Sequence, residues 1–195
     1  MNALIVVDIQ NDFLPGGSLG VADADTIVNK INAITKYFDY CIYTKDWHPA
    51  DHESFIYTWP EHCVQYSKGA EFPKNLIIPE NAIIIYKGCN CKIDSYSAFL
   101  DNDKATGTPL SGILLAKKVD TVFICGLATD YCVKYSALDA ISLGYKTYLI
   151  ADLTKPVNVK PNDYEKALQT MKKAGVKIIS SDNLELLINT TQSKS

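Results

Sequence analysis

The sequence predicts a three-layer α/β fold built on an open, mainly parallel sheet of six strands. Short apolar runs rich in β-branched residues alternate with amphipathic segments along the chain. Most of these runs are continuously apolar, as expected for strands that are buried on both faces of a parallel sheet. The 195 residues, 47% of them hydrophobic, are enough for one compact core.

Six apolar runs are the predicted strands, and three amphipathic segments are the predicted helices. In chain order the strands span residues 3–8, 40–46, 82–88, 120–126, 146–152 and 176–180, and the helices span 23–38, 130–143 and 162–174. Ile27, Ile31 and Ile34 mark one apolar face of the first helix, and Gly175 is a stop signal for the last. Alternation of strand and helix predicts parallel neighbours joined by helical crossovers.

One domain is expected over residues 1–188, followed by a short disordered tail over 189–195. The segment from residue 47 to 81 shows no clear helix or strand, and all three histidines of the chain lie in it. Irregular segments of this length inside a compact domain are usually functional. We therefore expect this segment to carry part of a site.

The composition argues against several classes of partner. The 19 basic and 22 acidic residues give a net charge of −3, which does not support nucleic acid or an anionic membrane as partner. No apolar run is long enough to span a bilayer, and no basic region precedes the first apolar run as in an export signal. The six cysteines are too sparse for a disulfide scaffold, so we expect reduced thiols in the cytoplasm. The sequence does not decide between a monomer and a homo-oligomer.

Polar groups follow the predicted strands at their carboxyl ends, where open α/β sheets bind ligands. Asp8 ends the first strand, Asp46 the second and Lys87 the third. The fourth strand leads through residues 126–130 to Cys132, in the first turn of the next predicted helix. If the sheet is parallel, these four groups converge on one edge.

Cys132 is the candidate nucleophile. The N-terminus of a helix favours a thiolate, and the ammonium of Lys87 would favour it further. Asp8 could accept the thiol proton and later protonate a leaving group. Cys125 and Cys41 lie inside apolar runs and are expected to be core thiols. Each of these groups alone is more often an ordinary packed or surface residue, so it is their convergence that predicts a site.

A second group of residues has the character of a metal site. Asp46 and His48 are two residues apart, so at an extended strand end they point to one side. His52 and His62 follow, and a carboxylate with two or three imidazoles suits Zn²⁺, Fe²⁺ or Mn²⁺. The alternative is three unrelated surface histidines. The Cys-Asn-Cys sequence at 89–91 is a weak metal signal, and ordinary loop thiols are the better interpretation.

Three aromatic residues lie near these segments: Phe13, Trp59 and Tyr96. They could clamp a flat ring. From the pattern alone, ordinary core aromatics are an equally good interpretation.

At these residues the sequence resembles the isochorismatase-like cysteine hydrolases, and among them the nicotinamidase group. The resemblance runs from residue 3 to residue 179 and is carried by VVDIQNDF (6–13), KDWHPADHESF (45–55), WPEHC (59–63), YKG (86–88), GTPL (107–110) and GLATDYCV (126–133). It implies a Rossmann-like fold and the hydrolysis of nicotinamide to nicotinate and ammonia through a cysteine thioester. The implied partner is thus a small pyridine carboxamide.

The resemblance also implies roles for particular residues. The catalytic triad falls on Asp8, Lys87 and Cys132, and one divalent metal ion falls on Asp46, His48 and His62. Zn²⁺ is the first expectation for the metal, with Fe²⁺ or Mn²⁺ as alternatives. His52 is either an additional ligand or a neighbour of the metal, because members of the family differ at this position.

The substrate pocket and the oxyanion hole follow from the same resemblance. A cis peptide bond is implied before Ala128, so that the N–H groups of Ala128 and Cys132 face the developing oxyanion. The residues implied to enclose the substrate are Phe13, Trp59, Tyr96, Leu127 and Ala128.

The stretch GCNCKIDS (88–95) is longer than in some nicotinamidases, so the resemblance does not fix the substrate breadth. One alternative is a sister activity on the same fold, acting on another small amide, a carbamoyl compound or isochorismate. Those relatives usually lack the Asp-x-His pair or the cysteine, and this chain has both. Another class is a non-enzymatic zinc or redox module that uses Cys89, Cys91 and Cys132.

Overall fold

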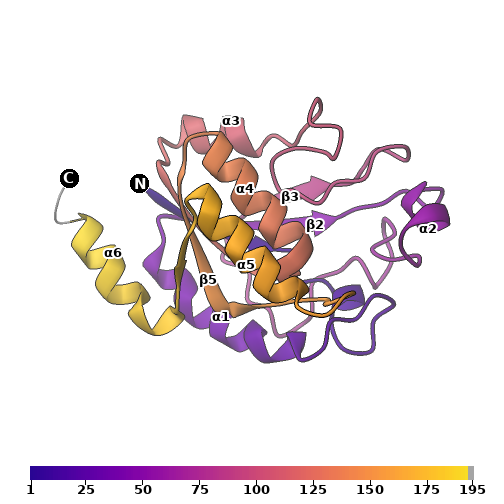
Figure 1. Cartoon of the computed structure of the whole chain (residues 1–195), viewed down its shortest axis with the longest axis horizontal. Coiled ribbons are helices and arrows are strands. Elements are labelled where there is room, and N and C mark those ends of the chain that lie inside the picture. Colours follow the sequence, from indigo (N-terminus) through magenta and orange to yellow (C-terminus); the bar gives the residue numbers. More distant parts are fainter. Residues whose placement is uncertain (193–195) are drawn as a thin grey trace.

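The structure is a computed structural model that describes residues 1–192, with side chains up to residue 188. Its framework is one six-stranded sheet (Figure 1). The strands are β1 (Asn2–Val7), β2 (Tyr40–Asp46), β3 (Ile83–Lys87), β4 (Thr121–Leu127), β5 (Lys146–Lys155) and β6 (Lys177–Ile179). All neighbouring strands in the sheet pair in parallel, which confirms the predicted sheet.

The strand order is β3-β2-β1-β4-β5-β6. Strands β2 and β3 therefore lie on one side of β1, and β4, β5 and β6 lie on the other. This reversal creates a crevice at the carboxyl ends of β1 and β4, the usual ligand site of such sheets. Gly126 pairs with Val7 there and has a φ of +109°. A Cβ on Gly126 would lie 2.1 Å from the Val7 carbonyl oxygen, so the close approach of these two strand ends requires glycine.

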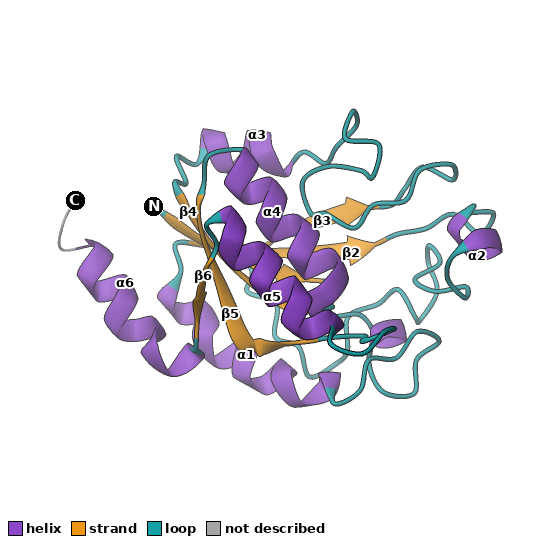
Figure 2. Ribbon diagram, viewed as in Figure 1, coloured by secondary structure: helices purple, strands orange, loops and turns teal. Residues whose placement is uncertain are grey.

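Helices cover both faces of the sheet (Figure 2). They are α1 (Val28–Ile34), α2 (Ser54–Tyr57), α3 (Leu110–Ala116), α4 (Lys134–Ser142), α5 (Asp163–Ala174) and α6 (Leu184–Gln192). Buried residues of α1 and α6 pack in one hydrophobic cluster, and buried residues of α3, α4 and α5 pack in the other. The three predicted layers are therefore present.

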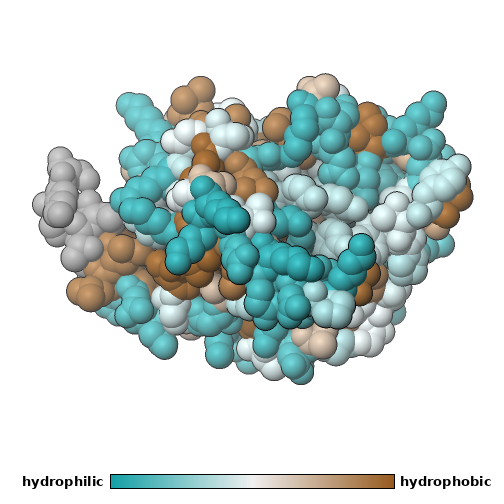
Figure 3. All heavy atoms as spheres, in the orientation of Figure 1, coloured by the Kyte–Doolittle hydropathy of each residue, from teal (hydrophilic) through white to brown (hydrophobic). Residues whose placement is uncertain are grey.

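The central strand β1 divides its side chains between the two clusters. Leu4 and Val6 face the α1 side, while Ala3, Ile5 and Val7 face the α4 side. All five are fully buried, as the continuous apolar run predicts for a central parallel strand. Figure 3 shows the hydrophilic outer surface of α5 in the middle of the view, as expected for the exposed face of a covering helix.

Two of the predicted helices are interrupted. The segment 23–38 contains α1 flanked by 3₁₀ turns at Ala24–Ile27 and Thr35–Tyr37. The segment 130–143 begins with a π turn, Thr129–Val133, in which Tyr131 has non-helical angles of φ −124° and ψ −105°. The third, α5, ends before Gly175, whose φ of +104° forms the predicted helix stop.

Three helices were not predicted. Helix α2 is a single turn inside the segment 47–81, and α3 is only seven residues long. Helix α6 continues to Gln192, so the backbone of 189–192 is helical where a tail was expected, and 193–195 lie outside the described residues. Leu184 and Ile188 are buried in the α1 cluster, and this packing explains a helix that the polar end of the sequence does not suggest. Within residues 1–192, no helix combines the length and apolar character needed to cross a membrane.

Candidate active site and metal centre

The structure brings the predicted strand-end groups together. Lys87 ends β3, Asp46 ends β2, Asp8 follows β1 and Cys132 follows β4, and these four strands are consecutive in the sheet. All four residues are buried, with exposed fractions between 0% for Asp8 and 7% for Cys132. Four ionisable side chains are therefore held together away from water.

The ammonium of Lys87 lies at the centre of this group. Its Nζ is 2.8 Å from Asp8 Oδ2 and 3.5 Å from Cys132 Sγ, and it also forms an ion pair with Asp46 Oδ1. A fourth contact, 2.9 Å, goes to the carbonyl oxygen of Ser95. Burial alone would lower the pKa of Lys87, but Asp46 and Asp8 outweigh it and hold that pKa well above its usual value. The two carboxylates thus favour the protonated form of Lys87.

Asp8 is held by Thr44, a residue that sequence analysis did not single out. The Thr44 hydroxyl donates to Asp8 Oδ1 at 2.6 Å and accepts from the Asp8 backbone N–H at 3.1 Å. Asp8 itself has a φ of +49°, which turns its backbone sharply at the end of β1. Burial raises the pKa of Asp8 to about 6, and Lys87 opposes this rise. A carboxylate with this pKa is ionised at neutral pH and still basic enough to accept a proton.

The surroundings of Cys132 differ from those expected, which were the first turn of a helix and conditions that favour a thiolate. Burial raises the pKa of the Cys132 thiol well above its usual value, and the attraction of Lys87 does not compensate for it. The residue also lies in the π turn that precedes α4, not in the first turn of an α-helix. Burial therefore favours a neutral Cys132 thiol beside Asp8 and opposes the thiolate that the helix N-terminus and Lys87 were expected to favour.

Asp46, His48 and His62 form a group whose ligand atoms all lie within 4.8 Å of one another. Asp46 divides its oxygens: Oδ1 faces Lys87, and Oδ2 is 3.6 Å from His48 Nε2 and 3.9 Å from His62 Nε2. Burial alone would raise the pKa of Asp46, but Lys87 and His48 outweigh it and hold that pKa below its usual range. The Nε2 atom of His48 is buried and has no hydrogen-bond partner. A carboxylate and two imidazole nitrogens at this spacing fit a divalent metal ion such as zinc.

Backbone carbonyls orient both of these imidazoles. Nδ1 of His48 is 2.9 Å from the Gly88 carbonyl oxygen, and Nδ1 of His62 is 2.8 Å from the Pro60 carbonyl oxygen. Such contacts from the second ring nitrogen are the usual way in which metal-binding histidines are held. A Cβ on Gly88 would lie 2.4 Å from His48 Cε1, so the His48 ring packs directly on a glycine.

Two further residues that sequence analysis missed support the metal group. The Gln10 side chain accepts from the Asp46 backbone N–H and donates to the Asp46 carbonyl, both at 2.8 Å. Asp12 Oδ2 accepts from the Cys63 backbone N–H at 2.7 Å, next to His62. Both belong to the stretch VVDIQNDF, and a buried amide and a carboxylate just after a strand end are the signal that could have revealed them.

The described residues contain two other groups that could hold a metal ion. In the group Asp8, Asp46 and Cys132, the ammonium of Lys87 already contacts each member. The second group is His48, His52 and Asp94, which shares His48 with the first site. Cys89 and Cys91 belong to no such group among residues 1–188, which disfavours the zinc or redox module. Cys41 and Cys125 are free thiols in the hydrophobic core, as predicted.

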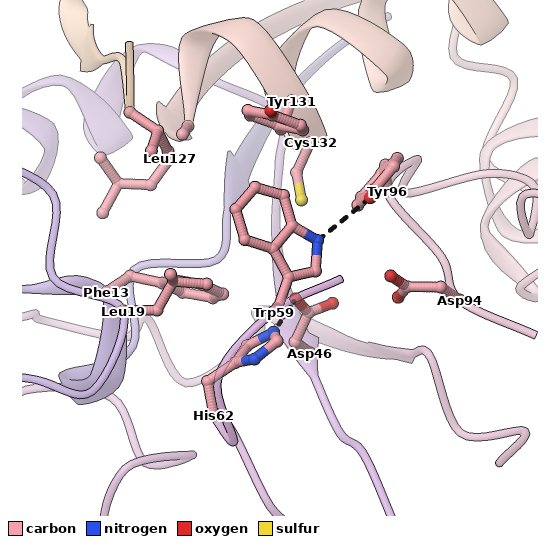
Figure 4. A pocket seen from close by; sticks show the side chains of 12 residues that line it. Phe13, Leu19, Asp46, Trp59, His62, Asp94, Tyr96, Leu127, Tyr131 and Cys132 are labelled. Carbon is pink, nitrogen blue, oxygen red and sulfur yellow. Dashed lines mark hydrogen bonds and ion pairs between the residues drawn. The ribbon is translucent and has the colours of Figure 1, made fainter. Parts of the chain in front are cut away.

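The aromatic residues line one pocket with the thiol and the metal group (Figure 4). Phe13, Trp59, Tyr96, Leu127 and Ala128 lie there, with Cys132, Asp46 and His62. In the close view, the sulfur of Cys132 points into the pocket from one end, and Asp46 and His62 lie towards the other. The Trp59 indole N–H donates to the Tyr96 hydroxyl at 3.1 Å, which ties two walls of the pocket together. The peptide bond between Leu127 and Ala128 is cis, as the resemblance implied.

Four other residues line the pocket without having been singled out: Leu19, Asp94, Tyr131 and Val157. Tyr131 precedes the nucleophile candidate in sequence, and its ring lies 4.9 Å from that of Trp59. Val157 is held in place by Asp130, whose two carboxylate oxygens accept from the N–H groups of Val157 and Asn158 at 2.9 Å and 2.8 Å. The path of the loop that carries Val157 follows from this contact and not from any periodicity in the sequence.

A thiol, a carboxylate and an ammonium meet at the switch point of an open α/β sheet, and this arrangement suits hydrolysis through a cysteine nucleophile. The comparison with known proteins gives the family: the chain matches the isochorismatase domain over residues 2–183, and it belongs to that family.

Similar proteins are nicotinamidases and pyrazinamidases. A nicotinamidase from Acinetobacter baylyi is 42% identical, over 93% of this chain and 94% of the relative. Among solved structures, PnC1 from L. infantum in complex with nicotinate has a TM-score of 0.89 and 38% identity, with 93% of each chain covered. The pyrazinamidase of Pyrococcus horikoshii in complex with zinc has a TM-score of 0.83 and 43% identity, with 92% of this chain and 98% of that chain covered.

Proposed function

We propose that this protein hydrolyses nicotinamide to nicotinate and ammonia, as a step of NAD salvage in the cytoplasm. The observation that carries the proposal is that one aromatic-lined pocket holds a buried thiol at one end and an Asp-His-His group at the other. The 42% identity to a nicotinamidase supports the substrate, as does the similarity to a structure that contains nicotinate.

Acylation would begin with the neutral Cys132 thiol. The Asp8 carboxylate takes the thiol proton while Sγ bonds to the carboxamide carbon, which gives a tetrahedral oxyanion. The N–H groups of Ala128 and Cys132 donate to this oxyanion. Lys87 stays protonated and stabilises the negative charge as it moves from the carboxylate to sulfur and oxygen.

Asp8 then gives the proton to the departing nitrogen, ammonia leaves, and a thioester to Cys132 remains. Asp8 next removes a proton from a water molecule, whose oxygen bonds to the thioester carbon. The carbon–sulfur bond breaks, Asp8 returns this proton to the Cys132 sulfur, and the acid product leaves as nicotinate with its proton lost to solvent. Each turnover therefore consumes one nicotinamide and one water, and the same carboxyl acts twice as base and twice as acid.

Asp46, His48 and His62 would hold the divalent metal ion, and when bound this ion supplies a Lewis acid for the pyridine nitrogen. Phe13, Trp59 and Tyr96 enclose the flat ring from the sides of the pocket. Gln10 fixes the main chain of Asp46, so the carboxylate keeps one oxygen for Lys87 and one for the metal group. The ring nitrogen and the carboxamide thus have separate binding positions at opposite ends of the pocket.

The test is ammonia release from nicotinamide by the purified protein loaded with Zn²⁺, Mn²⁺ or Fe²⁺. Cys132→Ala should release no ammonia yet keep its metal. The matched control is Cys125→Ala, which removes a second buried thiol seven residues earlier, in the hydrophobic core, and should retain activity. Substantial activity in Cys132→Ala would refute the thioester scheme. If ammonia is released from another small amide and not from nicotinamide with any metal, the proposed amide hydrolysis stands but the proposed substrate is wrong.

A further inference from the structure

The irregular segment 88–109, between β3 and α3, supplies two residues of the pocket, Asp94 and Tyr96. The Tyr96 hydroxyl accepts the indole N–H of Trp59 at 3.1 Å, the hydrogen bond drawn between these two residues in Figure 4. Side chains on an irregular segment are placed less precisely than those on a helix or strand, unless other contacts hold the segment. The contacts of this segment therefore decide how precisely one wall of the pocket is placed.

Helix α4, which begins directly after the turn that carries the thiol, holds this segment at two points close to Tyr96. The Tyr135 ring of α4 stacks on the Tyr96 ring, with centroids 5.3 Å apart and 24° between the ring planes. The hydroxyl of the buried Ser136 accepts from the Ala98 backbone N–H at 2.8 Å. One helix thus follows the nucleophile candidate and also supports the opposite pocket wall.

A third contact lies about one turn further along α4. The Lys104 ammonium donates to both carboxylate oxygens of Asp139, each at 2.9 Å. The Asp139 side chain is only 10% exposed, and that of Lys104 is 48% exposed. Nζ of Lys104 also lies 5.9 Å from the centre of the Tyr135 ring, over which Lys134 places a second ammonium at 4.6 Å. Lys104 therefore contacts both α4 and the ring on which Tyr96 stacks.

The backbone around Lys104 forms a closely bonded turn. Lys104 has a φ of +57°, an uncommon value for a residue other than glycine. Its N–H donates to the Asp101 carbonyl oxygen at 2.9 Å, and Asp103 Oδ1 accepts from the N–H groups of Ala105 and Thr106 at 2.9 Å and 3.0 Å. These hydrogen bonds hold Lys104 in a conformation that places its side chain against α4.

Asn102 joins this turn to both pocket residues. Its side-chain oxygen accepts from the Tyr96 backbone N–H at 3.1 Å, and its own backbone N–H donates to the Asp94 carbonyl oxygen at 2.8 Å. A displacement of the turn would therefore be transmitted to Asp94 and Tyr96 through a single residue. The Tyr135 ring gives a second connection between Lys104 and Tyr96.

We propose that Lys104 and Asp139 are positioning residues: their ion pair holds segment 88–109 against α4 and so fixes the place of Tyr96 and its hydrogen bond to Trp59. A lysine that contacts both oxygens of a nearly buried carboxylate has few alternative positions, whereas an exposed ion pair restrains little. Neither residue is among those that line the pocket, so the pair acts through Tyr96. This inference rests on the substrate pocket of the proposed function.

The alternative is an ion pair that only stabilises the fold. Its loss would then lower the melting temperature and leave the pocket and the binding of substrate unchanged. The proposal instead requires a change at Trp59 and in the KM for nicotinamide. These two measurements separate a positioning role from a structural one.

The first experiment is a ¹H–¹⁵N correlation spectrum of the full-length, zinc-loaded protein. The chain has two tryptophans, so two indole N–H signals are expected, and Trp47→Phe assigns them. Lys104→Met should shift or broaden the Trp59 signal and leave that of Trp47 in place, and Lys104→Arg, which retains a cation, should restore it. Lys166→Met is the matched control, because it removes an ion pair with Asp163 on α5, at 3.7 Å, and should change neither signal. An unchanged Trp59 signal in Lys104→Met would overturn the proposal.

The second experiment measures ammonia release from nicotinamide. Lys104→Met should raise the KM by about three- to tenfold, the size expected when one hydrogen bond in the pocket is weakened, and should change kcat by less than about twofold. Asp139→Asn should act in the same direction, and the double variant should be no worse than the worse single variant, because both remove one interaction. Lys104 is half exposed, so Lys104→Met should fold, and Asp139→Asn gives an independent test. An unchanged KM in Lys104→Met, or a loss confined to kcat, would overturn the proposal.

These outcomes are separable from a failure of the proposed function, because the indole spectrum needs no substrate. The expected change at Trp59 without ammonia release from nicotinamide would refute the hydrolase and support the role of the ion pair. Ammonia release with an unchanged Trp59 signal and an unchanged KM in Lys104→Met would support the hydrolase and refute that role.

Discussion

Thr44→Val should shift the acidic limb of the pH profile of kcat/KM for nicotinamide upward. The substitution keeps the shape of the side chain and removes the hydroxyl that donates to Asp8 Oδ1 at 2.6 Å. Burial already raises the pKa of Asp8 to about 6, so in the wild-type protein the base is lost as the pH falls through about 6. Below that value activity should fall about tenfold per pH unit, because the protonated carboxyl cannot accept the thiol proton.

The size of the shift follows from the hydrogen bond that is lost. A hydrogen bond to a charged group contributes about 1.5–3 kcal/mol, and one pKa unit corresponds to about 1.4 kcal/mol. The Asp8 pKa in Thr44→Val should therefore rise by about one to two units. For one unit, the ionised fraction at pH 6 falls from about one half to about one tenth, which is an activity loss of about fivefold. At alkaline pH the loss should largely disappear.

The assay is ammonia release across the pH range, with metal content checked for each sample. Thr44→Ser is the matched control, because it retains the hydroxyl and should keep the limb near pH 6. The free energy of unfolding of Thr44→Val should also fall by about 1–3 kcal/mol, since the backbone N–H of Asp8 loses its partner at 3.1 Å. An unchanged acidic limb in Thr44→Val would show that Asp8 is not the base or that Thr44 does not lower the pKa of Asp8.

Three further predictions concern the metal and the pocket. Gln10→Ala should weaken Zn²⁺ binding by about 10–100-fold in a chelator competition, because the Asp46 backbone loses both side-chain contacts; unchanged affinity would contradict this role. Tyr96→Phe should raise the KM for nicotinamide by about two- to tenfold with little change in kcat, since it removes the acceptor of the Trp59 N–H. A loss confined to kcat would contradict a role of this hydrogen bond in substrate binding. Removal of the metal with a chelator should weaken nicotinate binding, measured by calorimetry, by more than about tenfold, and Zn²⁺ should restore it. Unchanged nicotinate binding after chelation would show that the pyridine ring does not bind at the metal.

The sheet could be predicted because a strand that is buried on both faces needs apolar residues at successive positions, and such continuous apolar runs are visible in the sequence. β1 and β2 are fully buried or nearly so, and their bounds match the predicted runs within one or two residues. Helices α3 and α6 were not predictable in this way. α3 is seven residues long and contains Gly112, and α6 depends on the burial of Leu184 and Ile188, a tertiary contact.

The same distinction holds for the candidate site. Asp8, Asp46 and Lys87 stand at strand ends, and a parallel sheet brings such ends to one edge, so their meeting could be predicted without coordinates. Thr44 could not be identified, because a threonine inside a strand looks like part of the core until its partner is known. Asp94 lies in an irregular segment, and no periodicity reports the path of that segment to the pocket.

Lys87 makes the two halves of the site a single electrostatic unit, because one ammonium contacts the carboxylates of both Asp8 and Asp46. Substitutions at these two aspartates should therefore show strong epistasis. Asp46 raises the pKa of Asp8, so loss of Asp46 would leave Lys87 paired with Asp8 alone and would make the base weaker. A lineage that abandoned the metal would inherit a poorer proton acceptor in the same step. Divergence towards a metal-free activity would thus need compensating changes around Lys87.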